Sequence, residues 1–182
     1  EFVKKVRTVT QIPLVCMGYI NNVLTYGVEK FVLAAKSAGL DGAIIPDLPY
    51  EEASNMLAIC KKNDFSLINF VTPNTTAQRI NETCKNADGF IYCVSVNGVT
   101  GVREIDYTPI NEVVKIVKQQ TQTPVAIGFG IGTPAAAKAA SSVADNIIVG
   151  SAVMQKLMAE GLTAYGELIK TIRQALDEGS QV

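Results

Sequence analysis

The sequence predicts an α/β fold and, within that class, a (β/α)8 TIM barrel. Short apolar runs rich in β-branched residues recur along the chain, and amphipathic segments with helical spacing separate them. The runs lack strict alternation, which is typical of parallel strands covered on both faces. No dinucleotide-binding glycine motif accompanies them, which favours a barrel over a doubly wound sheet, although the sequence alone does not exclude the strand order of the latter.

Each expected strand is followed by an expected helix. Thr133 followed by Pro134 is typical of an N-cap residue and a first-turn proline. The expected strands are Pro13–Met17, Gly42–Ile45, Ser66–Val71, Gly89–Ser95, Pro124–Gly128 and Asn146–Val149. The expected helices are Val28–Ser37, Glu51–Lys62, Thr76–Asn86, Asn111–Gln120, Pro134–Ser142 and a longer one around Ala164–Asp177.

These elements amount to six βα units, whereas a complete barrel has eight units and typically about 250 residues. The chain has 182 residues and begins in a helix-like segment that leads into the first strand. We therefore expect one domain over residues 1–182 that corresponds to roughly the third to eighth βα units, with about the first two absent.

The composition indicates a globular protein without an extended charged surface. Lys and Arg number 16 against 17 Asp and Glu, so no charge excess favours nucleic acid or an anionic membrane surface. No apolar stretch approaches the roughly 20 residues of a membrane span, and no signal-peptide core is seen. The four cysteines lack metal-ligand spacing and are interpreted as reduced, mostly buried thiols. We expect a cytoplasmic protein that binds no metal.

The chain contains no histidine. Nucleophilic schemes that depend on histidine, most zinc sites and imidazole acid–base chemistry are thereby excluded for these residues. Any catalysis must depend on carboxylates, Tyr, Lys, Cys or backbone dipoles. No lysine lies inside an expected strand, which argues against a Schiff-base aldolase.

Glycines gather where the last two expected strands end. Gly128, Gly130 and Gly132 follow the fifth strand, and Gly150 with Ser151 follows the sixth. Barrel enzymes bind substrate at the C-terminal ends of their strands, and often hold a phosphate after the last two through backbone N–H groups and a helix N-terminus. The pattern predicts a phosphate site, and ordinary turn glycines are the alternative.

Other strand-end residues allow two interpretations. Asp47 follows the second strand, where it is either a base or an N-cap or turn residue. Tyr92 is either core packing or a phenol that hydrogen-bonds substrate, and Tyr19 and Asn21 share that ambiguity. Thr100 follows the fourth strand, as part of either a mobile lid or a simple turn.

Five segments in this order resemble the tryptophan synthase α subunit along nearly the whole chain: GYINNVLTYGVEKF, AGLDGAIIPDLPYEEA, GFIYCVSVNGVTG, PVAIGFGIGTP and IIVGSAV. The resemblance implies a (β/α)8 barrel that cleaves indole-3-glycerol phosphate to indole and glyceraldehyde 3-phosphate by a retro-aldol reaction in tryptophan biosynthesis. It also implies an α2β2 complex with a β subunit. Pyridoxal phosphate belongs to that partner, and no cofactor is expected in this chain.

The resemblance also implies residue roles. Tyr92 and Thr100 would support catalysis, whereas the catalytic glutamate and aspartate of the family lie on a unit that is absent here, so the chain alone is expected to be inactive. A non-catalytic phosphate-binding or interaction module is the alternative. Substrate phosphate would contact Gly101, Gly130, Gly150 and Ser151; the indole pocket would comprise Met17, Ile44, Phe70, Tyr92, Phe129 and Ile148; and the β-subunit interface would include Tyr19, Asn21, Asp47 and Pro49.

Overall fold

The computed structural model describes residues 1–94, 107–128 and 130–179. The chain falls into two compact units. Unit 1 comprises Glu1–Phe70 with Asn86–Phe90, and unit 2 comprises Val71–Lys85 with Ile91–Val182. The expectation of one domain over residues 1–182 stays a prediction.

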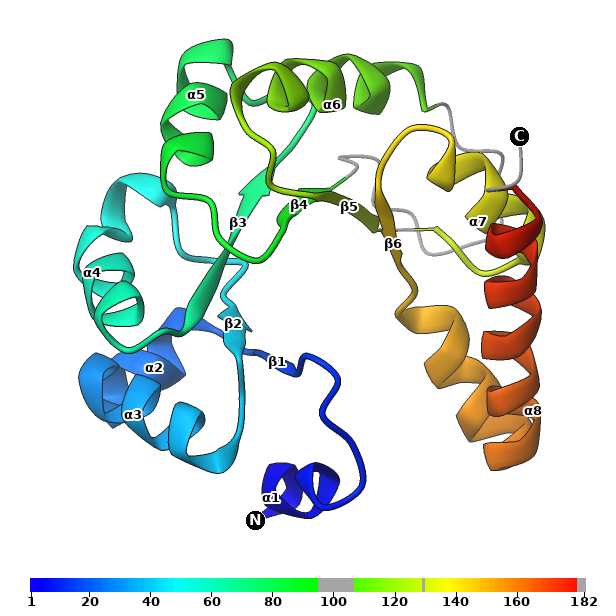
Figure 1. Ribbon diagram of the computed structural model, residues 1–182, viewed down its shortest axis with the longest axis horizontal. Coiled ribbons are helices and arrows are strands. Elements are labelled where there is room, and N and C mark those ends of the chain that lie inside the picture. Colours follow the sequence, from blue (N-terminus) through cyan, green and yellow to red (C-terminus); the bar gives the residue numbers. More distant parts are fainter. Residues whose placement is uncertain (95–106, 129, 180–182) are drawn as a thin grey trace. The chain divides into compact units, whose positions relative to one another are not determined.

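Strands and helices alternate along the chain as expected (Figure 1). The first part contains α1 (Phe2–Arg7), β1 (Val15–Met17), α2 (Ile20–Tyr26), α3 (Val28–Ala38), β2 (Gly42–Ile44), the 3₁₀ turn η1 (Tyr50–Glu52), α4 (Ser54–Lys62) and β3 (Ser66–Val71). The second contains α5 (Ala77–Lys85), β4 (Ile91–Val94), α6 (Thr108–Gln120), β5 (Val125–Gly128), α7 (Pro134–Ser141), β6 (Asn146–Ile148) and α8 (Ser151–Gly179).

All strand pairs described within the units are parallel. In unit 1, β1 pairs with β2 and β2 with β3, so that Met17 lies beside Ile44 and Ile44 beside Ile68. In unit 2, β4 pairs with β5 and β5 with β6, and Gly128 lies between Val94 and Ile148. Parallel pairing brings the C-terminal ends of neighbouring strands to one edge, which is where the sequence predicts the site.

The helix-facing side of each strand set is buried. Ala43 and Leu67 belong to a core cluster with Val32 of α3 and Met56 of α4. In unit 2, Cys93 and Ile127 are paired in register and fully buried. Side chains alternate along a strand, so Ile44 and Ile68 lie on the other face of β2 and β3, and Tyr92 on the other face of β4.

Three aspartates close to the starts of β2, β4 and β6 bind the start of the strand before; we call Asp41, Asp88 and Asp145 the strand-start aspartates. Asp41 Oδ2 accepts the Leu14 N–H at 2.7 Å, Asp88 Oδ2 accepts the Ser66 hydroxyl at 2.9 Å, and Asp145 Oδ2 accepts the Val125 N–H at 2.9 Å. The Asp41 bond links β1 with β2 in unit 1, and the Asp145 bond links β5 with β6 in unit 2, each by a contact that is independent of the strand ladder.

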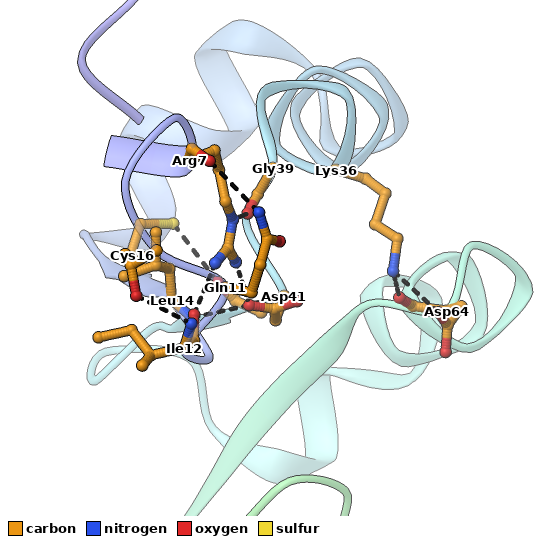
Figure 2. Close-up of polar contacts among 11 residues, drawn as sticks. Arg7, Gln11, Ile12, Leu14, Cys16, Lys36, Gly39, Asp41 and Asp64 are labelled. Atoms are coloured by element: carbon orange, nitrogen blue, oxygen red, sulfur yellow. Dashed lines mark hydrogen bonds and ion pairs between the residues drawn. The ribbon is translucent and has the colours of Figure 1, made fainter. Parts of the chain in front are cut away.

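Arg7 forms further hydrogen bonds to Asp41 and to the backbone next to it (Figure 2). Its guanidinium donates to the Gly39 carbonyl at 2.7 Å, the Ile12 carbonyl at 2.6 Å and Asp41 Oδ2 at 2.5 Å. The Leu14 N–H, and next the Arg7 guanidinium, hold the pKa of Asp41 below its ordinary value against the opposing effect of burial. Arg7 thus fastens α1 to the end of α3 and to the start of β2.

Several elements differ from expectation: α4 begins at Ser54 rather than Glu51, and α6 begins at Thr108 rather than Asn111. The helix α2 was not expected, and the last helix begins at Ser151 rather than near Ala164. Gly161, with φ +84° and ψ −175°, interrupts α8 and divides it into two helical parts. Strand ends are also one or two residues shorter than expected, except for β3, which matches Ser66–Val71.

Candidate functional site

Within the described residues, the first turn of α8 presents backbone N–H groups without a helical acceptor at the C-terminal end of β6. The Met154 N–H donates to the Gly150 carbonyl at 3.2 Å, which leaves the N–H groups of Ser151, Ala152 and Val153 ahead of the helical hydrogen bonds. Gly150 and Ser151 are exposed. Such a helix start attracts anions through its free N–H groups and its dipole.

The loop after β5 lies against this helix start. Gly130 has φ +70°, which a residue with a side chain rarely adopts. A Cβ on Gly132 would lie 3.0 Å from the Cβ of Ala152 in the first turn of α8. Two of the predicted phosphate residues, Gly150 and Ser151, therefore lie in a segment that packs directly against the Gly130–Gly132 loop.

The start of α7, in contrast, is already capped. Thr133 Oγ1 accepts the Ala136 N–H at 3.1 Å, and Pro134 occupies the first turn and has no N–H to offer. The predicted N-cap is confirmed. Of the two helix starts near these loops, that of α8 is the one with donors available for an anion.

Tyr92 covers the end of β5. A Cβ on Gly128 would lie 2.1 Å from the Tyr92 hydroxyl oxygen and 2.5 Å from Cε2, so the ring passes directly over Gly128. The side chain is 8% exposed, and burial raises the pKa of its phenol. Tyr92 is therefore a neutral phenol at physiological pH, with an O–H donor and an acceptor oxygen. Ile148, half-buried, pairs in register with Gly128 on the same face.

The other predicted indole-pocket residues divide between the units. Met17 and Ile44 are paired neighbours in unit 1, where Ile44 is buried and Met17 is 66% exposed. Phe70, at the end of β3, is half-buried. Phe129 lies outside the described residues, as do Thr100 and Gly101 of the expected lid. The structure thus places Met17 beside Ile44, and places Tyr92 and Ile148 each beside Gly128, while the shared pocket stays a prediction.

The four predicted interface residues of unit 1 lie at the start of α2, for Tyr19 and Asn21, and in the segment after β2, for Asp47 and Pro49. Asp47 Oδ1 accepts the Ile20 N–H at 2.9 Å, which ties the segment after β2 to the first residue of α2. Tyr19, Asn21, Asp47 and Pro49 are all exposed. Of the two interpretations of Asp47, helix capping is supported, although the capped helix is α2 rather than the one that follows Asp47 in the chain.

Two contributors to this region were not selected from the sequence. In the sequence, Gly132 is one member of a glycine run, and Ala152 has no polar group that would indicate a binding role. Their contact depends on how the β5–α7 loop meets α8, which no local sequence pattern indicates.

Among the residues that the structure describes, no group of three His, Cys, Asp or Glu side chains could hold a metal ion. None of the described helices has both the length and the apolar character needed to cross a bilayer.

Comparison with known proteins gives a consistent family match. The model of the family described as "Tryptophan synthase alpha chain" matches residues 1–178. The tryptophan synthase alpha chain of Thermoanaerobacter sp. (strain X514) is 46% identical over 157 residues, which cover 86% of this chain and 60% of that protein. That of Caldanaerobacter subterraneus subsp. tengcongensis is 39% identical over 181 residues, covering 97% and 69%. The chain thus spans about 60% of the length of the Thermoanaerobacter relatives.

Comparison with solved structures gives the same family as the sequence comparison. The tryptophan synthase alpha chain from Legionella pneumophila subsp. pneumophila superposes with a TM-score of 0.87 at 31% identity, covering 99% of this chain and 69% of that one. A chain from the tryptophan synthase α2β2 complex of Pyrococcus furiosus gives a TM-score of 0.83 at 29% identity, covering 96% and 71%. These likenesses confirm the predicted fold class.

Proposed function

The chain belongs to the tryptophan synthase alpha chain family, and from this premise we propose that its parent protein cleaves indole-3-glycerol phosphate to indole and glyceraldehyde 3-phosphate. The observation that carries the proposal is the contact between Gly132 and Ala152, which brings the β5–α7 loop against the free N–H groups of the α8 start. A phosphate dianion seated there would accept those N–H groups and interact favourably with the helix dipole.

The substrate's indole would lie on the apolar strand face of unit 2 that carries Tyr92 and Ile148. Tyr92 suits this role because its phenol is neutral and can donate a hydrogen bond. Thr100 and Gly101 would close over the phosphate, and no cofactor is required in this chain. Apolar walls with a few polar groups are typical of small-molecule sites.

General acid–base catalysis would come from carboxylates outside these 182 residues. Within the described residues, the carboxylate that follows a strand at the predicted site is Asp47, and it is engaged in capping α2. An acid–base group typically contributes about 10²–10⁴-fold in rate. The chain alone should therefore bind the phosphate and release no indole.

The partner would be a β subunit that carries pyridoxal phosphate and docks on the start of α2 and the segment after β2, which the Asp47–Ile20 hydrogen bond joins. The solved relative from Pyrococcus furiosus is described as part of an α2β2 complex, which supports this assignment. Tyr19 supports it too, because it is 65% exposed and aromatic residues are enriched at interfaces.

The test combines binding and turnover. Glycerol 3-phosphate binding, measured by calorimetry, should weaken at least tenfold in Ser151→Asp, because a carboxylate in the first turn of α8 repels the dianion. The control Ser54→Asp places the same charge at the first residue of α4 and should bind normally. Equal binding by both variants would refute the phosphate site.

The second expected result is indole release from indole-3-glycerol phosphate by the full-length parent and no release by this chain. If the parent releases no indole, the alternative of a non-catalytic binding module is favoured.

A further inference from the structure

A pocket of about 370 Å³ lies at the opposite end of β6 from the predicted phosphate site. Asp145, Asn146 and Ile147 line it from the start of β6, whereas Gly150 and Ser151 follow the other end of that strand. The remaining walls come from α7, through Lys138, Ser141 and Ser142, and from α8, through Arg173 and Leu176. α7 packs directly against α8, and all these residues belong to unit 2 (Figure 1).

Among the described residues that line the pocket, the acceptor oxygens of Asp145 are engaged, whereas Lys138 and Arg173 keep N–H donors available. Both oxygens of Asp145 are engaged, one by the Lys118 ammonium at 2.7 Å and the other by the Val125 N–H at 2.9 Å. Lys138, in contrast, forms no ion pair with any residue in the described part of the chain. Arg173 donates through one nitrogen to Asp177 Oδ1 at 2.5 Å, and a guanidinium has five N–H donors.

The C-terminus of α7 would ordinarily oppose an anion, but three carbonyls of its last turn accept hydrogen bonds. The Ser141 hydroxyl donates to the Lys138 carbonyl at 2.9 Å, and the Ser142 hydroxyl donates to the Ala139 carbonyl at 2.8 Å. The Ala140 carbonyl accepts the N–H groups of Val143 and Ala144. These bonds satisfy the carbonyls locally. Among the described lining residues, Asp145 and Arg173 each have an ion-pair partner, so the charge left without one is the cation of Lys138.

We propose that this pocket binds a small dianion, a phosphate monoester or a dicarboxylate, between Lys138 and Arg173. Arg173 would bind one pair of oxygens through its planar fork, and Lys138 would add a point charge. Asn146 offers an amide donor, while Ile147 and Leu176 provide an apolar wall for the carbon skeleton. The volume lies at the low end of small-molecule sites, about 300–1,000 Å³, which suits a ligand of metabolite size.

The experiment is a ¹H–¹⁵N NMR titration of this chain with inorganic phosphate and, separately, with malonate. Saturable shifts are expected at the backbone amides of Ser142 and Asn146, apart from any shift at Ser151 and Ala152 that reports the predicted substrate site. Saturable shifts with phosphate alone would identify the ligand as a phosphate monoester, and saturable shifts with malonate alone would identify it as a dicarboxylate. Each outcome supports a dianion site.

The double variant Lys138→Gln/Arg173→Gln should weaken binding at Ser142 and Asn146 at least tenfold. The matched control Lys115→Gln/Lys170→Gln removes the same charge from α6 and α8 outside the pocket and should change affinity less than twofold. Circular dichroism of both variants checks folding. Shifts that never saturate, equal losses in the two variants, or no shift at Ser142 and Asn146 with either anion would each overturn the proposal.

Discussion

At residue scale, position 128 has room for a hydrogen atom and nothing larger. The Tyr92 ring occupies the space that a side chain would need, with its oxygen 2.1 Å and Cζ 2.6 Å from the Cβ position. Gly128 therefore fixes where the phenol of Tyr92 lies, and the exchange of one hydrogen for a methyl group has consequences at the predicted indole site.

Gly128→Ala should lower the free energy of unfolding by about 1–3 kcal/mol, the usual cost of forcing extra carbon into a packed site. In a Tyr92→Leu background the same substitution should cost less, and the two effects should couple by about 0.5–3 kcal/mol in a double-mutant cycle followed by urea unfolding. Gly166→Ala on α8 is the control, because its Cβ position is open and the change should stabilise by about 0.4–1 kcal/mol. Additive effects of the Gly128 and Tyr92 substitutions would contradict the contact.

At element scale, α7 depends on a local cap. Thr133→Ala removes the hydroxyl that accepts the Ala136 N–H and should cost about 0.5–2 kcal/mol of unfolding free energy. Thr133→Ser keeps the hydroxyl and should stay close to the parent. Urea denaturation of the three proteins measures the difference, and an equal loss in both variants would assign the effect to the lost methyl group instead.

The Asp41 carboxylate gives β1, β2 and α1 a pH-dependent link. Its pKa is lowered in the folded state, so folding favours the charged form. The stabilisation is fully present above the ordinary aspartate pKa of about 3.9 and is lost as the pH falls through the lowered folded value. Because the side chain is 50% exposed and solvent screens its charge, we expect about 1 kcal/mol at neutral pH.

Urea unfolding of Asp41→Asn at pH 7 and at about pH 3 tests this link. The variant should be less stable than the parent at pH 7, and the difference should shrink at the lower pH. Asp64→Asn serves as the control, because its side chain is fully exposed and its ion-pair partner among the described residues is the surface residue Lys36. A difference between parent and Asp41→Asn that persists unchanged at low pH would contradict the assignment.

The sequence predicts the strands well because their signal is local. Ser66–Val71 is recovered without error, since its apolar run is bounded by Asp64 and Pro73. The helix α2 was missed because its N-terminus is bound by Asp47, 27 residues away, and no capping side chain stands beside it. The sequence does not predict the start of α8, because Gly150 and Ser151, the first residue of the helix, are interpreted there as a phosphate-binding loop.

The candidate site was predictable in outline and not in its contacts. Gly130, Gly150 and Ser151 follow strands and were therefore identified from position alone. The packing of Gly132 on Ala152 and of Tyr92 on Gly128 joins residues from different elements, and neither pair leaves a periodic trace in the sequence. The same holds for Arg7, whose three partners lie between 5 and 34 residues away.

At the scale of the whole molecule, the cysteines report folding in both units. Cys60 of unit 1 and Cys84 and Cys93 of unit 2 are buried, and Cys16 is half-buried. Burial raises the pKa of Cys60 to about 11 and that of Cys93 to about 12, so both remain protonated, unreactive thiols at neutral pH. The expectation that the thiols are mostly buried is thus confirmed.

Iodoacetamide labelling at pH 8, read by mass spectrometry of peptides, should modify Cys60 and Cys93 at least a hundredfold more slowly in the native chain than in urea. Cys16 should react fastest of the four under native conditions, because it is the least buried. Rapid native labelling of Cys60 alone would show that unit 1 opens separately, and rapid labelling of both buried thiols would contradict the packed cores.

The strand-start aspartates have a consequence for the order in which the chain acquires structure during synthesis. Their bonds span 27 residues for Leu14–Asp41, 22 for Ser66–Asp88 and 20 for Val125–Asp145. Short loops close at little entropic cost, and ribosomes add about 5–20 residues per second. Each link can therefore form within seconds of its own segment leaving the exit tunnel, while the rest of the message is still being translated.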